Sequence, residues 1–261
     1  MFNKIFKNNK PMIGMIHLPP LPGYIKHPGM DVVIKKALID LNTLQKAGFD
    51  GVLIENDNDQ PHQIGVSKSI IASFTKIMKQ VCKEARIPVG MEIIYDMPQT
   101  IKTAHKVGAD FVRLDVFVDT VLTKWGKIPA QAQELIALKE KIGAKELVML
   151  TDIQVKHAQL LDKKTLEQSA KEAIQYDSDA LIITGDWTGY PPSINDCEKV
   201  KKVTEATPVL IGSGLDKKNV KELFKYADGA IVGTSIKTGD YADLVKATNL
   251  INVVKKIRSN L

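Results

Sequence analysis

The chain has 261 residues, 44% hydrophobic and 25% charged, a composition typical of a soluble globular protein with a large core. Its 36 basic and 30 acidic residues give a formal charge of +6, but the lysines are scattered and no arginine cluster occurs, so nothing favours nucleic-acid binding. No stretch approaches 18 consecutive apolar residues, so no membrane span is predicted.

The cysteine content and the N-terminus indicate where such a protein works. Cys82 and Cys197 lie far apart and lack the spacing of a metal site or a disulfide framework, so we expect a reducing, cytoplasmic environment. The first ten residues are basic but contain no apolar segment of signal-peptide length. A mildly basic balance also suits a small anionic substrate.

An apolar run followed by a segment of helical periodicity recurs about every thirty residues. The predicted strands, in chain order, cover residues 11–18, 51–56, 88–94, 111–117, 147–155, 180–184, 208–212 and 229–233. Helices are predicted at residues 31–48, 67–85, 99–107, 130–142, 165–176, 195–205 and 243–258, with a further helix between the last two strands. Residues 118–129 are expected to form a long loop.

Eight strands alternating with eight helices predict an α/β protein with a closed (β/α)8 TIM barrel. No break in composition marks a linker, so we expect one domain over residues 1–261. A doubly wound open sheet is the alternative, but eight regular units in this length fit closure better. The same junction between helix and strand recurs four times: small residues end the helix, and an aspartate directly precedes the next strand. We call this the aspartate joint, and its aspartates are Asp50, Asp110, Asp179 and Asp228.

Two glycine turns follow the seventh and eighth predicted strands. In (β/α)8 barrels, phosphate is often bound by these two loops together with a helix N-terminus. We therefore predict a phosphate site; the alternative is that the glycines only close two strand-to-helix turns. The predicted phosphate-binding residues are Gly212, Ser213, Gly214, Gly233, Thr234 and Ser235.

Polar side chains are predicted to converge at the barrel mouth. Alternate strand residues point inward, and catalytic groups of such barrels lie at the C-terminal strand ends. Burying this many ionisable groups is costly unless they are paired or used, so the ring is interpreted as a catalytic site, with an internal ion-pair network as the alternative. The predicted catalytic residues are His17, Glu55, Glu92, Arg113, Asp115, Asp152 and Lys156.

Individual members of this ring allow two interpretations. His17, beside prolines, is either a structural hydrogen-bonding group or a catalytic one. Lys156 forms a Schiff base only if it is desolvated, and contact with an anion is the favoured role. His62 reaches the site from the second loop or is solvated there. Substrate contacts are predicted after the sixth strand, at Thr184, Gly185 and Asp186.

The four carboxylates admit two kinds of chemistry. With His17 they would hold a divalent cation, so a metal is possible but no cofactor is certain. They would otherwise supply a general acid and base for proton transfer beside a carbonyl. Spacing does not choose between these.

Several motifs together resemble the BtpA family, which includes SgcQ-type proteins, over nearly the whole chain. They are IGMIHLPPLPG (residues 13–23), AGFDGVLIENDNDQP (47–61), PVGMEII, VGADFVRLDVF, TDIQVKHA (151–158), DALIITGDWTG (179–189) and the GSG and GTS turns. The resemblance implies a phosphate-binding barrel like those that bind ribulose phosphate. It also implies Asn at positions 92 and 115 and His at position 154, where this chain has Glu92, Asp115 and Gln154.

The leading hypothesis is an isomerase, epimerase or lyase that acts on a small phosphorylated metabolite, a phosphosugar. Some members resemble components of sugar-catabolism gene sets, whereas the family name comes from photosystem I biogenesis. The rival hypothesis is therefore a non-catalytic assembly or regulatory factor. A third hypothesis is an enzyme that acts on a nucleotide or nucleoside, which would be favoured if Trp187 and Tyr190 formed an aromatic platform at the barrel mouth. We also expect self-association into a homo-oligomer.

Overall fold

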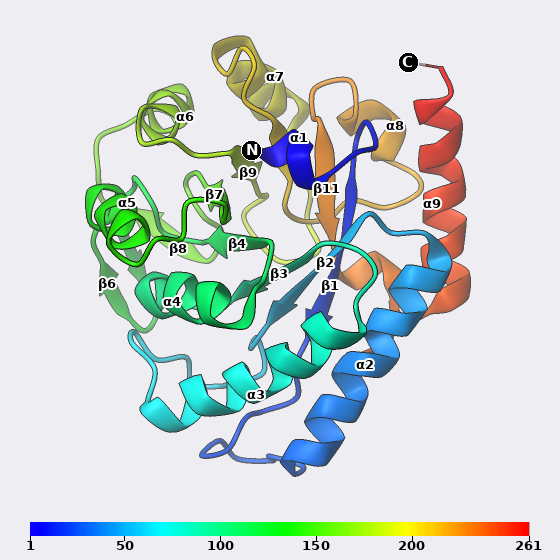
Figure 1. Cartoon of the computed structure of the whole chain (residues 1–261). Coiled ribbons are helices and arrows are strands. Elements are labelled where there is room, and N and C mark those ends of the chain that lie inside the picture. Colours follow the sequence, from blue (N-terminus) through cyan, green and yellow to red (C-terminus); the bar gives the residue numbers. More distant parts are fainter. Residues whose placement is uncertain (261) are drawn as a thin grey trace.

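In a computed structural model that describes residues 1–260, eight parallel strands close into a barrel (Figure 1). Around the barrel they follow the order β1-β11-β10-β9-β7-β4-β3-β2. The strands are β1 (Met12–His17), β2 (Gly51–Glu55), β3 (Val89–Glu92), β4 (Phe111–Leu114), β7 (Val148–Asp152), β9 (Ala180–Ile183), β10 (Val209–Ile211) and β11 (Gly229–Val232). The predicted TIM barrel is confirmed, and the open-sheet alternative is wrong.

Helices between the strands surround the barrel (Figure 1). They are α2 (Met30–Ala47), α3 (Lys68–Glu84), α4 (Met97–Val107), α5 (Ala132–Lys141), α6 (Leu166–Gln175), α7 (Ile194–Val203), α8 (Val220–Leu223) and α9 (Leu244–Arg258). The helix predicted between the last two strands is thus a single turn, α8. No helix within residues 1–260 combines the length and apolarity that crossing a membrane requires.

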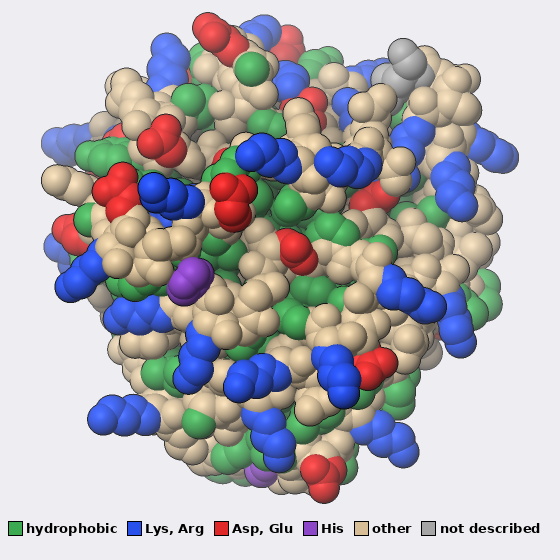
Figure 2. Space-filling view, in the orientation of Figure 1, with side chains coloured by type: hydrophobic (Ala, Val, Ile, Leu, Met, Phe, Trp, Pro, Cys, Tyr) green, Lys and Arg blue, Asp and Glu red, His purple; other side chains and the backbone are tan. Residues whose placement is uncertain are grey.

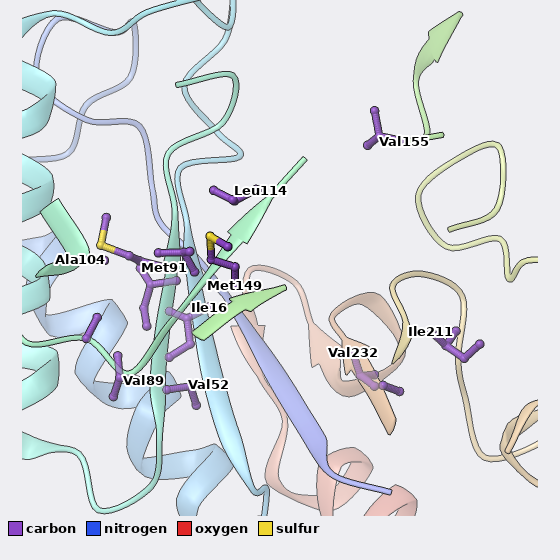
Figure 3. Packing of buried hydrophobic residues seen from close by; sticks show 14 of the residues in the cluster. Ile16, Val52, Val89, Met91, Ala104, Leu114, Met149, Val155, Ile211 and Val232 are labelled. Atoms are coloured by element: carbon purple, nitrogen blue, oxygen red, sulfur yellow. The ribbon is translucent and has the colours of Figure 1, made fainter. Parts of the chain in front are cut away.

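Barrel residues alternate between two hydrophobic layers, as the period-two pattern predicts. One layer fills the barrel interior and includes Leu53, Phe111 and Ile182. The other lies between the strands and the helices, and Figure 3 shows part of it, with Ile16 and Met91 among its residues. This alternation fixes which polar residue at each strand end faces the barrel axis.

A short N-terminal helix, α1 (Phe2–Ile5), closes the end of the barrel where the strands begin. Phe2 and Phe6 are buried in the interior layer, and the Phe6 ring lies 5.5 Å from the Phe111 ring. The sequence did not predict this helix because two phenylalanines in a basic segment give no helical periodicity. Its position closes the barrel interior at this end.

The recurring aspartate joint is a reciprocal hydrogen-bond pair. Each aspartate carboxylate accepts from a backbone N–H at the start of the preceding barrel strand, and the aspartate N–H donates to the carbonyl of that same residue. All eight distances lie between 2.6 and 3.0 Å. The pairs are Asp50–Met12, Asp110–Val89, Asp179–Met149 and Asp228–Val209. At the end of the barrel where the strands begin, these bonds therefore link the strands in four pairs: β1 with β2, β3 with β4, β7 with β9 and β10 with β11.

Two predicted strands are shorter than expected, because the chain leaves the barrel after Leu114 and after Asp152. The released segments form a small antiparallel sheet that the sequence analysis assigned to loops. Its strands are β5 (Val121–Thr123), β6 (Gly126–Ile128) and β8 (Ala158–Leu160), in the order β6-β5-β8. After β11 come a 3-10 turn (Thr234–Ile236) and the hairpin β12 (Lys237–Thr238) and β13 (Tyr241–Ala242).

Charged side chains are spread over the face that Figure 2 shows, with acidic groups among the basic ones. This face carries no continuous basic patch.

Replacing Asp110 with alanine tests the aspartate joint. Asp110→Ala leaves the Val89 N–H without its acceptor, and we expect the free energy of unfolding to fall by about 2 kcal/mol, as for other hydrogen bonds to a charged group. Asp110→Asn keeps an acceptor oxygen and should lose less. Urea unfolding of the three proteins measures this, and equal losses in the two variants would contradict the proposed role.

Candidate functional site

A cavity opens at the C-terminal ends of the barrel strands. Its empty volume, including the part open to solvent, is about 780 Å³. Six of the seven predicted catalytic residues line it: His17, Glu55, Glu92, Arg113, Asp115 and Lys156. The seventh, Asp152, is buried beneath and reaches the site only through Arg113.

Arg113 is the centre of this arrangement. Its Nε and Nη2 donate to the two carboxylate oxygens of Asp152, both at 2.8 Å, which is the bidentate geometry that a guanidinium favours. Its Nη1 lies 3.4 Å from Glu92 and 3.6 Å from Glu55. One cation thus faces three carboxyl groups, and the ion-pair network considered from the sequence does exist around it.

The network satisfies its buried oxygens incompletely. Within residues 1–260, Asp115 Oδ1 accepts no hydrogen bond, and Glu55 Oε2 and Glu92 Oε2 have Arg113 Nη1 only at ion-pair distances of 3.6 and 3.4 Å. A buried polar atom without a partner costs about 1–3 kcal/mol. Since all three residues line the cavity, a bound molecule with hydroxyl groups would supply the missing partners.

The carboxyl groups differ in their affinity for a proton. Burial, assisted by the charges of Glu55 and Asp115, raises the pKa of Glu92 well above its usual value, although Arg113 opposes this. Burial and the charge of Asp152 raise the pKa of Asp115 to about 7. Burial also disfavours the charged form of Glu55, but His17 and Arg113 outweigh it and lower its pKa. The pKa values of the neighbouring Glu92 and Glu55 therefore shift in opposite directions, the pattern of an acid beside a carboxylate.

His17 ends β1 at the edge of the cavity. Its Nδ1 lies 3.6 Å from Asp57 Oδ2, and its backbone carbonyl accepts a 2.6 Å hydrogen bond from Lys36. Burial lowers the pKa of the His17 imidazole, while the charge of Glu55 opposes the shift. An imidazole in this position can accept or donate a proton.

Lys156 extends from the segment after β7, and its backbone N–H donates to Thr184 Oγ1 at 3.1 Å. Burial and the charge of Arg113 lower the pKa of its ammonium group. The predicted substrate contacts Thr184, Gly185 and Asp186 do not line this cavity; they border a neighbouring hollow beside Trp187. Instead, Thr184 and Asp186 accept hydrogen bonds from the segment after β7, and the Gly185 N–H donates to the turn after β10.

Both glycine turns reach the cavity, through Gly212, Ser213, Gly214, Gly233 and Thr234. Ser235 does not line it, because its hydroxyl donates to the Leu215 carbonyl. The Ser213 hydroxyl is also engaged: it donates to the Tyr190 carbonyl and accepts from the Gly185 N–H.

The backbone of these turns carries free donors. In the described part of the chain, the N–H groups of Gly214, Thr234 and Ser235 donate no hydrogen bond. Neighbouring free N–H groups in a turn form an anion-binding concavity. The donors that suit an anion are therefore backbone groups and not the hydroxyls of Ser213 and Ser235.

The loop of residues 185–191 packs over the first glycine turn. A Cβ on Gly214 would lie 2.1 Å from Pro191 N, and the positive φ of +66° also favours glycine there. His157 Nε2 lies 2.8 Å from Thr188 Oγ1, which holds the loop to the segment after β7. Thr188 and Gly189 consequently line the cavity.

The sequence analysis missed cavity residues that lie beyond the strand ends. Tyr95 has a φ of +60°, and its N–H donates to Asp115 at 3.4 Å. Asp57 follows β2 by two residues. Inward and outward alternation holds only within a strand, so it could not place these side chains; a motif of polar residues just past each strand was the available signal.

Other residues considered from the sequence lie elsewhere. Trp187 and Tyr190 are 61% and 66% exposed and do not line the cavity. Gln154 turns outward, where its backbone N–H donates to Asp119 and its amide to Ser169. His62 does line the cavity, and its ring packs edge-on against Tyr95 at 5.7 Å.

The acidic groups are not grouped as metal ligands. Among residues 1–260, no three His, Cys, Asp or Glu side chains are placed to hold one metal ion.

Comparison with known proteins now decides the family. The model of the BtpA family matches residues 8–259. The chain belongs to the BtpA family. Its expected membership is confirmed, and the match covers the barrel and every cavity residue.

Relatives in this family span nearly the whole chain. An uncharacterised protein of Pyrococcus horikoshii is 34% identical over 258 residues, which cover 96% of this chain and 98% of that protein. The photosystem I biogenesis protein BtpA of Synechocystis is 32% identical over 236 residues, which cover 89% of this chain and 82% of that protein.

Solved structures show the same fold for this BtpA-family chain. The (S)-3-O-geranylgeranylglyceryl phosphate synthase of Thermoplasma acidophilum, in complex with its substrate sn-glycerol-1-phosphate, superposes with a TM-score of 0.64. The match covers 97% of this chain and 96% of that protein at 15% identity. At such low identity the similarity shows a shared barrel architecture and nothing about substrate.

Asp115→Asn tests the raised pKa of Asp115. The unfolded chain ionises this carboxyl near pH 3.8 and the folded protein near 7, so between these values the folded state binds more protons and loses stability as pH rises. The loss is complete above about pH 7 and amounts to about 4 kcal/mol. The asparagine variant has no such group, so its stability relative to the parent should rise with pH over that range.

Urea unfolding of both proteins across this range measures the effect, with Asp186→Asn, at an exposed position, as the control. A stability difference independent of pH would show that Asp115 titrates normally.

Proposed function

We propose that the protein is an enzyme that performs acid–base chemistry on a small phosphorylated metabolite, of the phosphosugar type. The observation that carries this proposal is one cavity lined both by two glycine turns with free N–H groups and by carboxyl groups gathered around Arg113, whose pKa values shift in opposite directions. A substrate anchored by its phosphate at the turns would extend its other end toward the carboxyls.

The carboxyl groups support proton transfer next to a carbonyl. In the proposed reaction, the Glu55 carboxylate removes a proton from carbon, and Glu92 donates one to oxygen. Arg113 stabilises the negative charge that develops between them. Isomerisation, epimerisation and carbon–carbon cleavage all use this step.

Phosphate recognition is supported by the turn after β11. Thr234 begins a 3-10 turn, and its N–H and that of Ser235 donate to no group of the described chain. Lys237 follows the turn; burial, assisted by the charge of Lys36, lowers its pKa to about 8. A partly charged ammonium there adds attraction for a dianion.

A scaffold role without catalysis predicts closed ion pairs and no cavity. Ion pairs around Arg113 are present, but the open cavity beside them and the Asp115 oxygen without a hydrogen bond favour an enzyme. The name of the Synechocystis relative, which refers to photosystem I biogenesis, belongs to that protein. We do not include a role in photosystem I biogenesis in the function proposed for this chain.

A divalent cation bound together with the substrate would use the same carboxyl oxygens, supplemented by phosphate oxygens. The binding experiment below is therefore run with and without Mg²⁺. A shift that requires Mg²⁺ would add the cation to the proposed site.

Gly233→Ala tests the phosphate site. A Cβ at this position would contact nothing closer than Met15 Cβ at 3.4 Å, and φ is −122°, so the variant should fold. The added methyl lies at the cavity wall and should weaken phosphate binding. Thermal shift with ribose 5-phosphate against ribose measures this; saturation at 100 times Kd stabilises the parent by about 2.7 kcal/mol.

The parent should respond to ribose 5-phosphate and not to ribose, and Gly233→Ala should respond weakly. Lys171→Ala, at an exposed position, is the control for general charge effects. Equal shifts with the sugar and its phosphate would count against phosphate recognition.

A further inference from the structure

Lys156 differs from every other cation at the cavity because its amine is unpaired. It is the one lysine that lines the cavity among residues 1–260. Within the same residues, no carboxylate lies within 4.0 Å of its Nζ. Its backbone is nevertheless held by the hydrogen bond to Thr184. An amine in this situation is poorly explained as a structural ion pair.

The other buried lysines nearby have different surroundings. Lys36 Nζ donates to Asp40 and to the His17 carbonyl, both at 2.6 Å. Lys237 is partly buried but does not line the cavity. Lys156 alone combines access to the cavity with freedom from an acidic partner.

The surroundings also weaken the hold of the amine on its proton. Burial and the Arg113 guanidinium lower the pKa of the half-buried Lys156, and Glu55, Asp152 and Glu92 compensate only in part. A lysine that is partly desolvated beside another cation is the arrangement that activates an amine for attack on a carbonyl.

We propose that the ε-amino group of Lys156 forms an imine with the carbonyl carbon of the substrate. This inference rests on the proposed function and narrows its substrate class to phosphorylated aldehydes and ketones. It also assigns Lys156 as a nucleophile, whereas contact with an anion was the role favoured from the sequence.

The step balances with groups that line the cavity. The nitrogen lone pair attacks the carbonyl carbon, and one amine proton passes to the carbonyl oxygen to give a carbinolamine. Glu92 then protonates the hydroxyl, which leaves as water while the nitrogen lone pair completes the protonated imine. That imine draws electrons from a neighbouring C–H or C–C bond, and the Glu55 carboxylate accepts the proton released.

Reductive trapping tests the proposal. The protein is incubated with dihydroxyacetone phosphate or ribulose 5-phosphate, and sodium borohydride then delivers hydride to any imine carbon. We expect a stable adduct whose mass is that of the ketone less one oxygen atom, mapped to Lys156 by peptide mass spectrometry. Lys156→Arg keeps the charge and should lose the adduct, whereas the exposed Lys171→Arg should keep it.

Glycerol 3-phosphate, which has the phosphate but no carbonyl, separates the two proposals. Thermal stabilisation by this compound and by the ketones, with no adduct at Lys156 or with the adduct at Lys237, would overturn the imine and leave the proposed function standing. Absence of stabilisation by any of them would overturn both. Mapping the adduct in the parent protein decides the matter even if Lys156→Arg does not fold.

Discussion

The site depends on one buried cation, Arg113. Three carboxyl groups face its guanidinium. A buried carboxylate without a counter-charge would strongly destabilise the folded barrel. The bidentate contact with Asp152 fixes the orientation of the guanidinium, so that its remaining nitrogen faces Glu92 and Glu55. A single positive charge cannot neutralise all of them, and the pKa of Glu92 is accordingly raised while that of Glu55 is lowered. The difference in pKa between Glu55 and Glu92, on which the proposed acid–base chemistry depends, therefore arises where carboxyl groups outnumber cations.

Strand register delivers these groups to one place. Arg113 lies opposite Leu150 in the ladder between β4 and β7, and Glu55 lies opposite both His17 and Glu92. The aspartate joints tie the opposite ends of the same strands, so a register slip would break two hydrogen bonds at each joint as well as bury the wrong faces. Bonds at the closed end of the barrel thus help to determine the chemistry at the open end.

The sequence was sufficient to predict the barrel and the inward-facing residues, because both follow from period-two alternation in buried strands. Arg113 and Glu92 could be assigned to the mouth on that basis alone. The pattern fails where the backbone leaves the ladder: Gln154 keeps the predicted parity but adopts a φ of 47° and points outward. The pKa values could not be predicted from the pattern either. Cationic neighbours, His17 among them, lower the pKa of Glu55, whereas neighbouring carboxyl groups raise that of Glu92.

The glycine turns at one end of the cavity and the carboxyl groups at the other depend on different features of the chain. The proposed phosphate binding at the turns would use free backbone N–H groups, which glycine permits there. Reaction at the carboxyl end needs a particular balance of charge, which a single amide in place of a carboxyl would change. The amides that the family resemblance implies at positions 92 and 115 would leave Arg113 with fewer negative neighbours and remove the proton of Glu92. If the proposed function holds, the carboxyl end of the cavity, at Glu92 and Asp115, is where a change of residue would alter the chemistry while the glycine turns stayed the same.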